Sequence, residues 1–398
     1  MAKISDLSDE LLVKILSYLP TKVAVSTSVL SKQWEFLWMW SPKLVYSDYS
    51  DINDSNSSSL LRYRDFIAKH LPLHRAPIIE SLLLRFHGGS VQPDDIKSWA
   101  GIAVSRCVRE LNIDCYYFPK EPAILLPISL YTCKSLVTLK LEGIQILVDV
   151  PRMVCLPSLK TLHLHTVKYS NEDSLRLLLS YCPVLEDLSI DQDNNDQLGA
   201  VVVILPSLLR LSLIIDSYCS SDGYVIVTPS LKYLKVSDNR NSPSSYLIEH
   251  MPELEEADIY VNSSPEKLLV SITSVKRLTL HVRFNEDLEP VYHAGIVFNQ
   301  LEQFKLTISS DGWSKLIVRL LKDSPNLRVL NLDTDNIEVF EEYEPDIWDN
   351  AQSSVPQCLL KSLETFKFEG YEGGPEERDF LIYIFKHARH LKSSVILS

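Results

Sequence analysis

The sequence has few cysteines, and none of them stands in a paired spacing. Its 7 cysteines among 398 residues include no CxxC pair and none of the spacings of a zinc module. Asp6, Asp9 and Glu10 stand where a secretion signal needs basic residues and then an apolar run. An odd number of cysteines without such a signal favours reduced thiols in a reducing compartment, so we expect a cytoplasmic or nuclear protein.

Several motifs of enzymes and membrane proteins are also missing. The 11 glycines form no phosphate-binding loop, and neither an HExxH motif nor a nucleophile elbow occurs. The longest uninterrupted apolar run, residues 200–205, is too short to span a bilayer. A net charge of -13 argues against nucleic acid, which normally needs a basic face. We therefore expect no catalytic residues, no cofactor or metal, and no binding to nucleic acid or membrane.

Apolar residues in the first forty positions follow a helical spacing. Across residues 7–19 they recur every three or four positions, and Pro20 ends the pattern. Thr21 can start a second helix, and Ser31 can open a third that Pro42 ends. Three short helices cannot bury so many large side chains by themselves. They either pack on the following domain or present an apolar face to a partner.

Residues 4–44 resemble the F-box of plant F-box proteins over nearly its whole length. They read ISDLSDELLVKILSYLPTKVAVSTSVLSKQWEFLWMWSPKL. The matching elements are DELL–KILSYLPTK, AV–TS–LSK–W and LW–P-L, in order and at the family's spacing. Ser8 stands where the family usually has proline, and Gln33 where it usually has arginine. These two departures predict weakened rather than abolished docking.

The resemblance implies that this segment binds a Skp-family adaptor and, through it, a cullin–RING ligase. Ile15 and Trp34 could instead hold the three helices together, and the sequence leaves both roles open. The docking face carried over from the family comprises Leu7, Leu11, Leu12, Ile15, Leu16, Leu19, Pro20, Trp34, Leu37 and Trp38.

A unit of the form L-x-x-L-x-L recurs from residue 79 to residue 363. Its copies start 21 to 29 residues apart, with one interval of 36, and leucine-rich repeats have periods of 20–29. The alternating apolar residues fit strands that bury one face only by stacking into a parallel sheet. The repeats are uneven and mostly lack the asparagine of the regular motif, so we expect an irregular solenoid. Helices are expected on its convex side at residues 174–180 and 314–322.

Positions 3, 5 and 7 of each unit should face the concave side of the sheet. Aromatic and arginine side chains there are candidates for substrate binding, with an ordinary solvated face as the alternative. The set comprises Arg210, Tyr233, Lys235, Asp258, Tyr260, Arg277, His281 and Lys305. His163 and His165 alternate on one strand, but two ligands without a partner cluster favour polar surface over a metal site.

The segments outside the repeats have distinct compositions. Residues 47–59 read SDYSDINDSNSSS, which predicts a solvated linker. Residues 333–349 carry eight acidic and no basic side chains, which predicts a solvated insertion, with steering of a basic substrate as the alternative. Residues 358–397 read CLLKSLETFKFEGYEGGPEERDFLIYIFKHARHLKSSVIL and resemble the FBD region of plant F-box/LRR proteins. Within them, residues 375–390 should form a capping helix.

The expected fold is α/β: an all-α three-helix F-box, then an irregular leucine-rich-repeat solenoid with parallel strands on its concave face and a C-terminal FBD cap. The expected domains are residues 1–46 (F-box), 47–74 (linker), 75–349 (solenoid) and 350–398 (FBD region and cap).

The expected function is substrate recognition in an SCF-type (Skp–cullin–F-box) ubiquitin ligase. The F-box would dock the Skp-family adaptor, and the repeats would bind an unknown protein substrate. The alternative is a ligase-independent interaction scaffold, which the departures at Ser8 and Gln33 favour. A receptor whose repeats bind a small ligand comes third, and a hydrolase or transferase has the least support.

Overall fold

The structure, a computed structural model, divides into two compact units, Met1–Leu205 and Pro206–Ser398. The division falls inside the repeats rather than after the F-box, and each unit is described by itself. The described residues are 4–48, 57–87, 91–115, 122–192, 200–217, 219, 223–240, 245–261, 266–282, 296–308, 313–334 and 355–398.

The first unit begins with short helices joined by tight turns. They are η1 (Ile4–Asp6), α1 (Asp9–Leu16), α2 (Thr21–Ser26), η2 (Thr27–Val29) and η3 (Leu37–Trp40). The expected third helix is shorter than predicted, because the chain between Ser31 and Leu37 is built from turns. The N–H of Trp34 donates to the carbonyl of Ser31, and that of Leu37 to the carbonyl of Trp34. These turns bring side chains into one core without a full helix.

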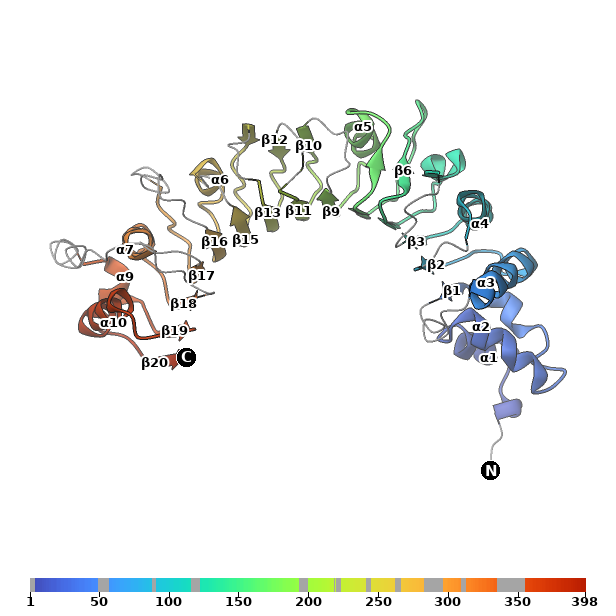
Figure 1. Cartoon of the computed structure of the whole chain (residues 1–398), viewed down its shortest axis with the longest axis horizontal. Coiled ribbons are helices and arrows are strands. Elements are labelled where there is room, and N and C mark those ends of the chain that lie inside the picture. Colours follow the sequence, from blue (N-terminus) through green and yellow to red (C-terminus); the bar gives the residue numbers. More distant parts are fainter. Residues whose placement is uncertain are drawn as a thin grey trace. The chain divides into compact units, whose positions relative to one another are not determined.

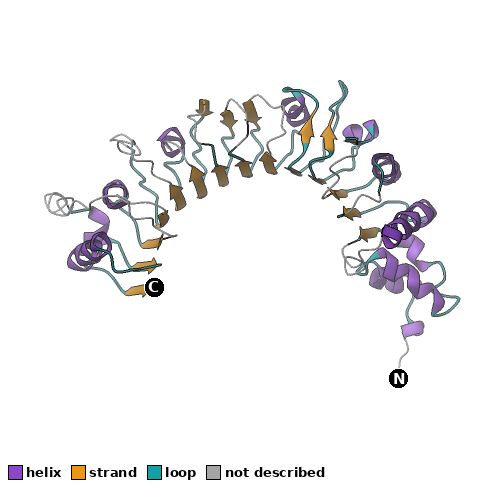
Figure 2. Cartoon of the chain, in the orientation of Figure 1, coloured by secondary structure: helices purple, strands orange, loops and turns teal. Residues whose placement is uncertain are grey.

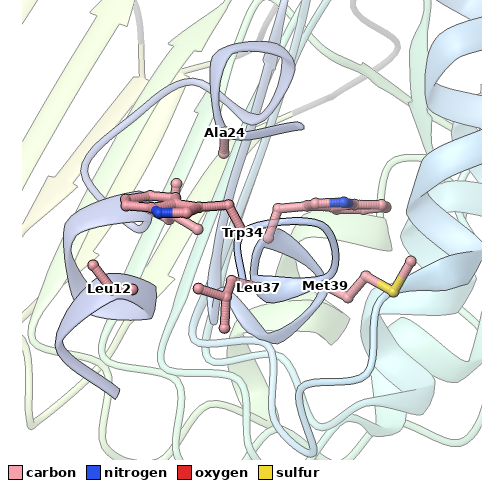
Figure 3. Close-up of a cluster of buried hydrophobic side chains, with 7 residues drawn as sticks. Leu12, Ala24, Trp34, Leu37 and Met39 are labelled. Atoms are coloured by element: carbon pink, nitrogen blue, oxygen red, sulfur yellow. The ribbon is translucent and has the colours of Figure 1, made fainter. Parts of the chain in front are cut away.

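That core is a buried cluster shared by the short helices (Figure 3). Two leucines of α1 meet side chains of α2 and of the segment that ends in η3. Fully burying a side chain of this size contributes about 1.5–3 kcal/mol, so the cluster supplies much of what stabilises this small region. Its members are Leu12, Leu16, Ala24, Trp34, Leu37, Trp38 and Met39.

Part of the expected linker, residues 47–74, is a helix instead. Residues 57–70 form α3 (Ser57–His70), and η5 (Leu71–Leu73) follows. Tyr63, Ile67 and Leu71 are buried at helical spacing, so this stretch has an apolar helical face. The serine-rich residues at its start made the segment look like a linker by composition. The remaining residues of the serine-rich stretch, 49–56, lie outside the described residues.

The main sheet of the first unit is parallel. Its strands follow the order β1-β2-β3-β5-β7-β9, each beside the next repeat's strand. Along these strands, apart from the buried end of β3, buried side chains alternate with half-buried or exposed ones, as the repeat pattern predicts. The strands are β1 (Lys43–Ser47), β2 (Ser81–Phe86), β3 (Glu110–Cys115), β5 (Thr138–Glu142), β7 (Thr161–His165) and β9 (Asp187–Gln192).

The other elements of the first unit follow these strands in the chain. A second small parallel sheet has the order β4-β6-β8. Helix α5 has the bounds predicted from the sequence. The elements are α4 (Pro93–Ser105), η6 (Ile128–Thr132), α5 (Ser174–Ser180), β4 (Ile124–Leu125), β6 (Ile146–Val148), β8 (Lys168–Tyr169) and β10 (Ala200–Ile204).

The second unit repeats this plan, with strands on one face and helices on the other (Figures 1 and 2). Its main sheet is parallel, with the order β11-β13-β15-β16-β17-β18-β19-β20. These strands are β11 (Arg210–Ile215), β13 (Tyr233–Asp238), β15 (Glu256–Val261), β16 (Arg277–Val282), β17 (Gln303–Ile308), β18 (Val329–Thr334), β19 (Thr365–Glu369) and β20 (Ser393–Leu397). Its other elements are β12 (Gly223–Val227), β14 (Ser245–Ile248), α6 (Glu266–Ser271), α7 (Trp313–Asp323), α9 (Gln357–Lys361) and α10 (Pro375–His387).

The C-terminal helix packs as a cap on an aromatic core. Phe380 of α10 lies 5.1 Å from the ring of Trp313 in α7 and 5.9 Å from that of Phe366 in β19. The buried carboxylate of Glu377 accepts a hydrogen bond from the N–H of Gly374, which satisfies a donor at the helix start. The helix ends three residues earlier than the predicted residue 390, and β20 follows it. The predicted acidic insertion lies outside the described residues from 335 onward.

The F-box core continues into the chain that follows it through Trp38. Its ring lies 5.5 Å from that of His70 and 5.3 Å from that of His74. The carbonyl of Met39 accepts hydrogen bonds from the N–H groups of Arg75 and Ala76. His74 is almost fully buried, and burial lowers its pKa from 6.5 to about 4.

We expect the protonation of His74 to destabilise the protein below about pH 6.5. The unfolded chain binds this proton near pH 6.5 and the folded chain only near pH 4, so stability is lost as the pH falls between these values. Going from pH 7 to pH 5 should cost about 2 kcal/mol from this residue alone. Chemical denaturation at both pH values should show a smaller loss in His74→Phe than in the unsubstituted chain. Equal losses would contradict the assignment.

Candidate functional site

Exposed large apolar side chains gather in the F-box helices. Leu11 is 49% exposed, Tyr18 75%, and Trp40 47%, although the same few elements enclose a dry core. A small domain that buries one apolar set and exposes another has the composition of a partner surface. The exposed set in this region comprises Ile4, Leu11, Ile15, Tyr18, Val23, Val29, Leu30, Phe36 and Trp40.

The ten residues expected to dock an adaptor divide between the inside and the outside of this region. Leu11, Ile15 and Pro20 are exposed, and Leu7 and Leu19 are half-buried against the core. The other five, namely Leu12, Leu16, Trp34, Leu37 and Trp38, are buried within the chain itself. Of the two residues whose role the sequence left open, Trp34 belongs to the core, whereas Ile15 is exposed.

The geometry of α1 explains this division. Leu12 and Leu16 point into the core, and Leu11 and Ile15, one position earlier, form a second apolar stripe with Tyr18 one turn further on. An apolar face this wide exceeds what one packed interface needs. The sequence analysis did not single out Tyr18, Phe36 or Trp40. The only signal for them was an excess of large apolar residues over what three short helices can bury.

The two departures from the F-box pattern both fit the local structure. Ser8 precedes α1 with φ −67° and ψ 155°, a backbone that proline also adopts, so the local chain path does not require proline. The Gln33 amide donates to Asp9 Oδ1 at 3.0 Å and to the Leu7 carbonyl at 3.4 Å. Gln33 therefore ties the turn before Trp34 to the start of α1.

The eight residues expected on the concave side all lie on one face of the second unit's main sheet, opposite to the buried leucines. They fall into three rows that run across neighbouring strands. In the first row Arg210 pairs with Tyr233, and in the second Lys235 pairs with Asp258. Tyr260 and His281 are register partners in the third row. Arg277 belongs to the first row and Lys305 to the second.

Charges on this face are paired between strands. Asp258 lies 4.0 Å from Lys235 Nζ and 3.8 Å from His281 Nε2. Lys305 Nζ lies 3.2 Å from Asp333 Oδ2. Burial lowers the pKa of His281, with the charge of Asp258 acting in the opposite direction. The face therefore offers polar and aromatic groups held in a fixed lateral network.

The first unit carries a comparable polar face with two stacked histidines. The rings of His163 and His165 lie 5.7 Å apart and nearly parallel. His163 Nε2 lies 3.6 Å from Asp187 Oδ1, and His165 Nε2 lies 2.8 Å from Ser189 Oγ. Among the described residues, no group of three or more histidine, cysteine, aspartate or glutamate side chains could hold a metal ion. Nor does any described helix combine the length and apolarity needed to cross a membrane.

Three family models match this chain. The model described as "F-box domain" matches residues 4–46. The model described as "FBD-associated F-box protein At5g56370, LRR repeats" matches residues 96–264, and "FBD" matches residues 351–396.

Full-length relatives from Arabidopsis thaliana are similar to the chain from end to end. Putative FBD-associated F-box protein At5g56700 is 68% identical and aligns with 100% of this chain and 98% of its own length. Putative FBD-associated F-box protein At5g56690 is 63% identical, and FBD-associated F-box protein At5g60610 is 60% identical, each over 100% of both chains. Among solved structures, the APL1 leucine-rich repeat domain aligns with 82% of this chain and 72% of its own, with 15% identity and a TM-score of 0.38.

We expect truncation of the two tryptophans of η3 to lower stability by very different amounts. Trp38 is 4% exposed and Trp40 is 47% exposed. Trp38→Ala should lower the free energy of unfolding by about 3–5 kcal/mol, because it leaves a cavity in the core. Trp40→Ala should change it by less than about 1 kcal/mol. Denaturant-induced unfolding of the full chain measures both changes. Similar losses of stability would contradict the assignment of Trp38 to the buried core and of Trp40 to the surface.

Proposed function

This chain belongs to the FBD-associated F-box proteins of plants, and we propose that it is the substrate-recognition subunit of an SCF-type ubiquitin ligase. Its F-box docks a Skp-family adaptor, and its repeats bind a protein substrate. The observation that carries the proposal is the exposed apolar surface on the F-box helices. A cytoplasmic or nuclear location, expected from the sequence, is part of the same proposal.

The adaptor contacts the exposed part of the expected docking face. Leu11 and Ile15 of α1 together with Pro20 make the direct contacts, and Leu7 and Leu19 flank them. The five buried members act indirectly, because they hold the helices in the arrangement that exposes the others. Aromatic residues outside the expected set, such as Tyr18 and Trp40, add to the same surface. Large aromatic side chains are frequent energetic centres of interfaces.

The substrate binds the open face of the repeats. The eight residues in three rows supply tyrosine, arginine and histidine side chains whose positions are fixed by strands rather than by loops. Fixed side chains lose little conformational entropy on binding. Lateral ion pairs such as Lys305–Asp333 keep charged groups in place until a partner exchanges for them.

In this role the chain supplies position rather than chemistry. Other subunits transfer ubiquitin, and the chain holds a substrate lysine within their reach, which is catalysis by proximity. The chain itself needs no cofactor. Cys115, Cys182 and Cys358 are buried, and burial raises the pKa of each thiol, to about 12 for Cys182 and Cys358, which is the opposite of an activated thiolate.

The ligase-independent scaffold receives no support from the two departures in the F-box. Ser8 takes a backbone that suits proline, and Gln33 makes hydrogen bonds that tie the F-box together. Among the described residues, we therefore find no observation that favours the scaffold over the ligase subunit.

We expect the exposed leucine of α1 to be required for adaptor binding. Leu11→Asp, alone or with Ile15→Asp, should weaken binding to a purified plant Skp-family adaptor by about thirtyfold or more, because a charge replaces a central apolar contact. Lys69→Ala, an exposed change on α3 outside this surface, should bind normally. Isothermal titration measures the affinities, and circular dichroism checks folding. Normal binding by the double variant would exclude α1 as the docking element.

We expect the open face of the second unit to matter for substrate and not for adaptor. Tyr260→Ala with His281→Ala removes an aromatic pair whose rings lie 5.9 Å apart, while the buried side of the sheet is untouched. Plant cells that express this variant should lose the ubiquitylated proteins enriched by the unsubstituted chain, with unchanged cullin recovery. Loss of cullin would instead indicate misfolding. An unchanged set of ubiquitylated proteins would exclude this face.

A further inference from the structure

The two terminal strands of the main sheets end differently. In the first unit, the outer edge of β1 is covered by the F-box, because the hydroxyl of Thr21 in α2 accepts a hydrogen bond of 2.9 Å from the N–H of Val45. In the second unit, β20 pairs with β19 on one side. Within the part of the chain that the structure describes, no strand or side chain hydrogen-bonds to the other side. One terminal edge is covered and the other is open.

The open edge has none of the usual protection. Strand β20 reads SSVIL, with no charge, no proline and no glycine. Natural edge strands are normally shielded by lysine, proline, bulges or a covering segment, because unpaired backbone groups recruit other strands. All five side chains of β20 are exposed, including Val395, Ile396 and Leu397. The capping repeat of a solenoid normally has a polar outer face.

The backbone of β20 is arranged to pair once more. Ser393 N–H donates to the carbonyl of Glu364, and the Leu397 carbonyl accepts from the N–H of Tyr371, so these residues point inward to the existing sheet. Successive residues of a strand alternate in the direction of their N–H and C=O groups. The groups of Ser394 and Ile396 therefore point outward.

Apolar side chains of α10 extend the same edge. Ile396 is the register partner of Phe368, whose ring lies 6.5 Å from that of Phe380 in α10, so Ile396 is on the face that α10 covers. Phe385 lies 6.3 Å from the ring of Phe366 yet is 48% exposed, and Ile382 is exposed as well. The hydrophobic core of this unit thus reaches the surface beside the open strand.

We propose that the open edge of β20 binds β20 of a second copy of this chain, as an antiparallel pair whose twofold axis passes through Val395. In that register Ser394 of one copy faces Ile396 of the other, so all outward N–H and C=O groups find partners. Ser393 faces Leu397, and Val395 faces its own counterpart. Both sets of Ile396, Ile382 and Phe385 lie beside the new pair and leave water. The closed twofold arrangement uses up both edges, so the assembly stops at a dimer.

Charge complementarity favours a second copy over an unrelated strand. Arg389 and Lys392 are exposed and precede β20, Lys392 being paired at 2.8 Å with Glu364 of its own chain, whereas Glu372 is exposed near the end of β20, next to the Tyr371 that bonds to Leu397. Antiparallel pairing puts the beginning of one strand beside the end of the other. The basic end of each copy then lies beside the acidic end of its partner. Parallel pairing would place like charges together.

The twofold axis at Val395 makes the proposal testable by charge exchange. Val395→Lys and Val395→Glu each place like charges directly opposite one another, which destabilises a strand pair. Light scattering on the full chain, in complex with its adaptor where that aids solubility, should give a dimer mass at tens of micromolar. Each variant alone should give half that mass, and an equimolar mixture of the two should recover the dimer. Val270→Lys, a matched exposed change on α6, should remain dimeric.

Recovery in the mixture also shows that both variants fold. A monomeric unsubstituted chain at these concentrations overturns the proposal, as does a dimer that neither substitution at Val395 affects. Failure of both single variants and of their mixture to dimerise places Val395 away from any axis and overturns the register. Adaptor binding, measured on the same samples, is unaffected in every case, so the result stands apart from the proposed ligase role.

Discussion

Each repeat of this chain has a strand that is stable only beside another one. The unit L-x-x-L-x-L makes a strand with one apolar face and two edges, and neither the face nor the edges can be satisfied inside a single repeat. Stacking in parallel satisfies both: the leucines of neighbouring strands share one buried layer, and every inner edge finds a partner. The open face is then free to carry polar and aromatic side chains at fixed spacing. The same stacking that provides stability thus provides the candidate binding surface.

The need of each strand for a neighbour makes the middle of the chain regular, but the first and last strands lack a neighbouring repeat on one side. At the N-terminal end, the F-box region must fill its own small core and also present an apolar surface. It achieves both because α1 has two adjacent apolar stripes, with Leu12 and Leu16 inside and Leu11 and Ile15 outside. Trp38 belongs to the inside set and connects that core to the residues after it through its ring contacts with His70 and His74.

The sequence was sufficient wherever a short period repeats. Alternation and spacing predict the register of the strands, the burial of their leucines and the bounds of α5. They do so because the positions of the apolar residues show which side chains are buried. It was insufficient where burial depends on which elements meet. Leu11 and Leu12 are the same residue type on the same helix, and only the packed structure separates their roles. Helix α3 was missed for a related reason: a serine-rich start hides an apolar face formed by Tyr63, Ile67 and Leu71.

The covering of β1 by the F-box has a consequence for the proposed ligase role. Proximity catalysis requires that the docking element be rigidly attached to the strands that follow it, because a loose tether spreads a bound substrate over many positions. The hydrogen bond from the Val45 N–H to the Thr21 hydroxyl attaches α2 to β1, and the bonds from the Arg75 and Ala76 N–H groups to the Met39 carbonyl attach η3 to the residues before β2. The F-box and these strands accordingly belong to one compact unit. In this chain the element that covers the outer edge of β1 is also the element proposed to dock the adaptor, so a partner bound there would be oriented by the strands of the first unit.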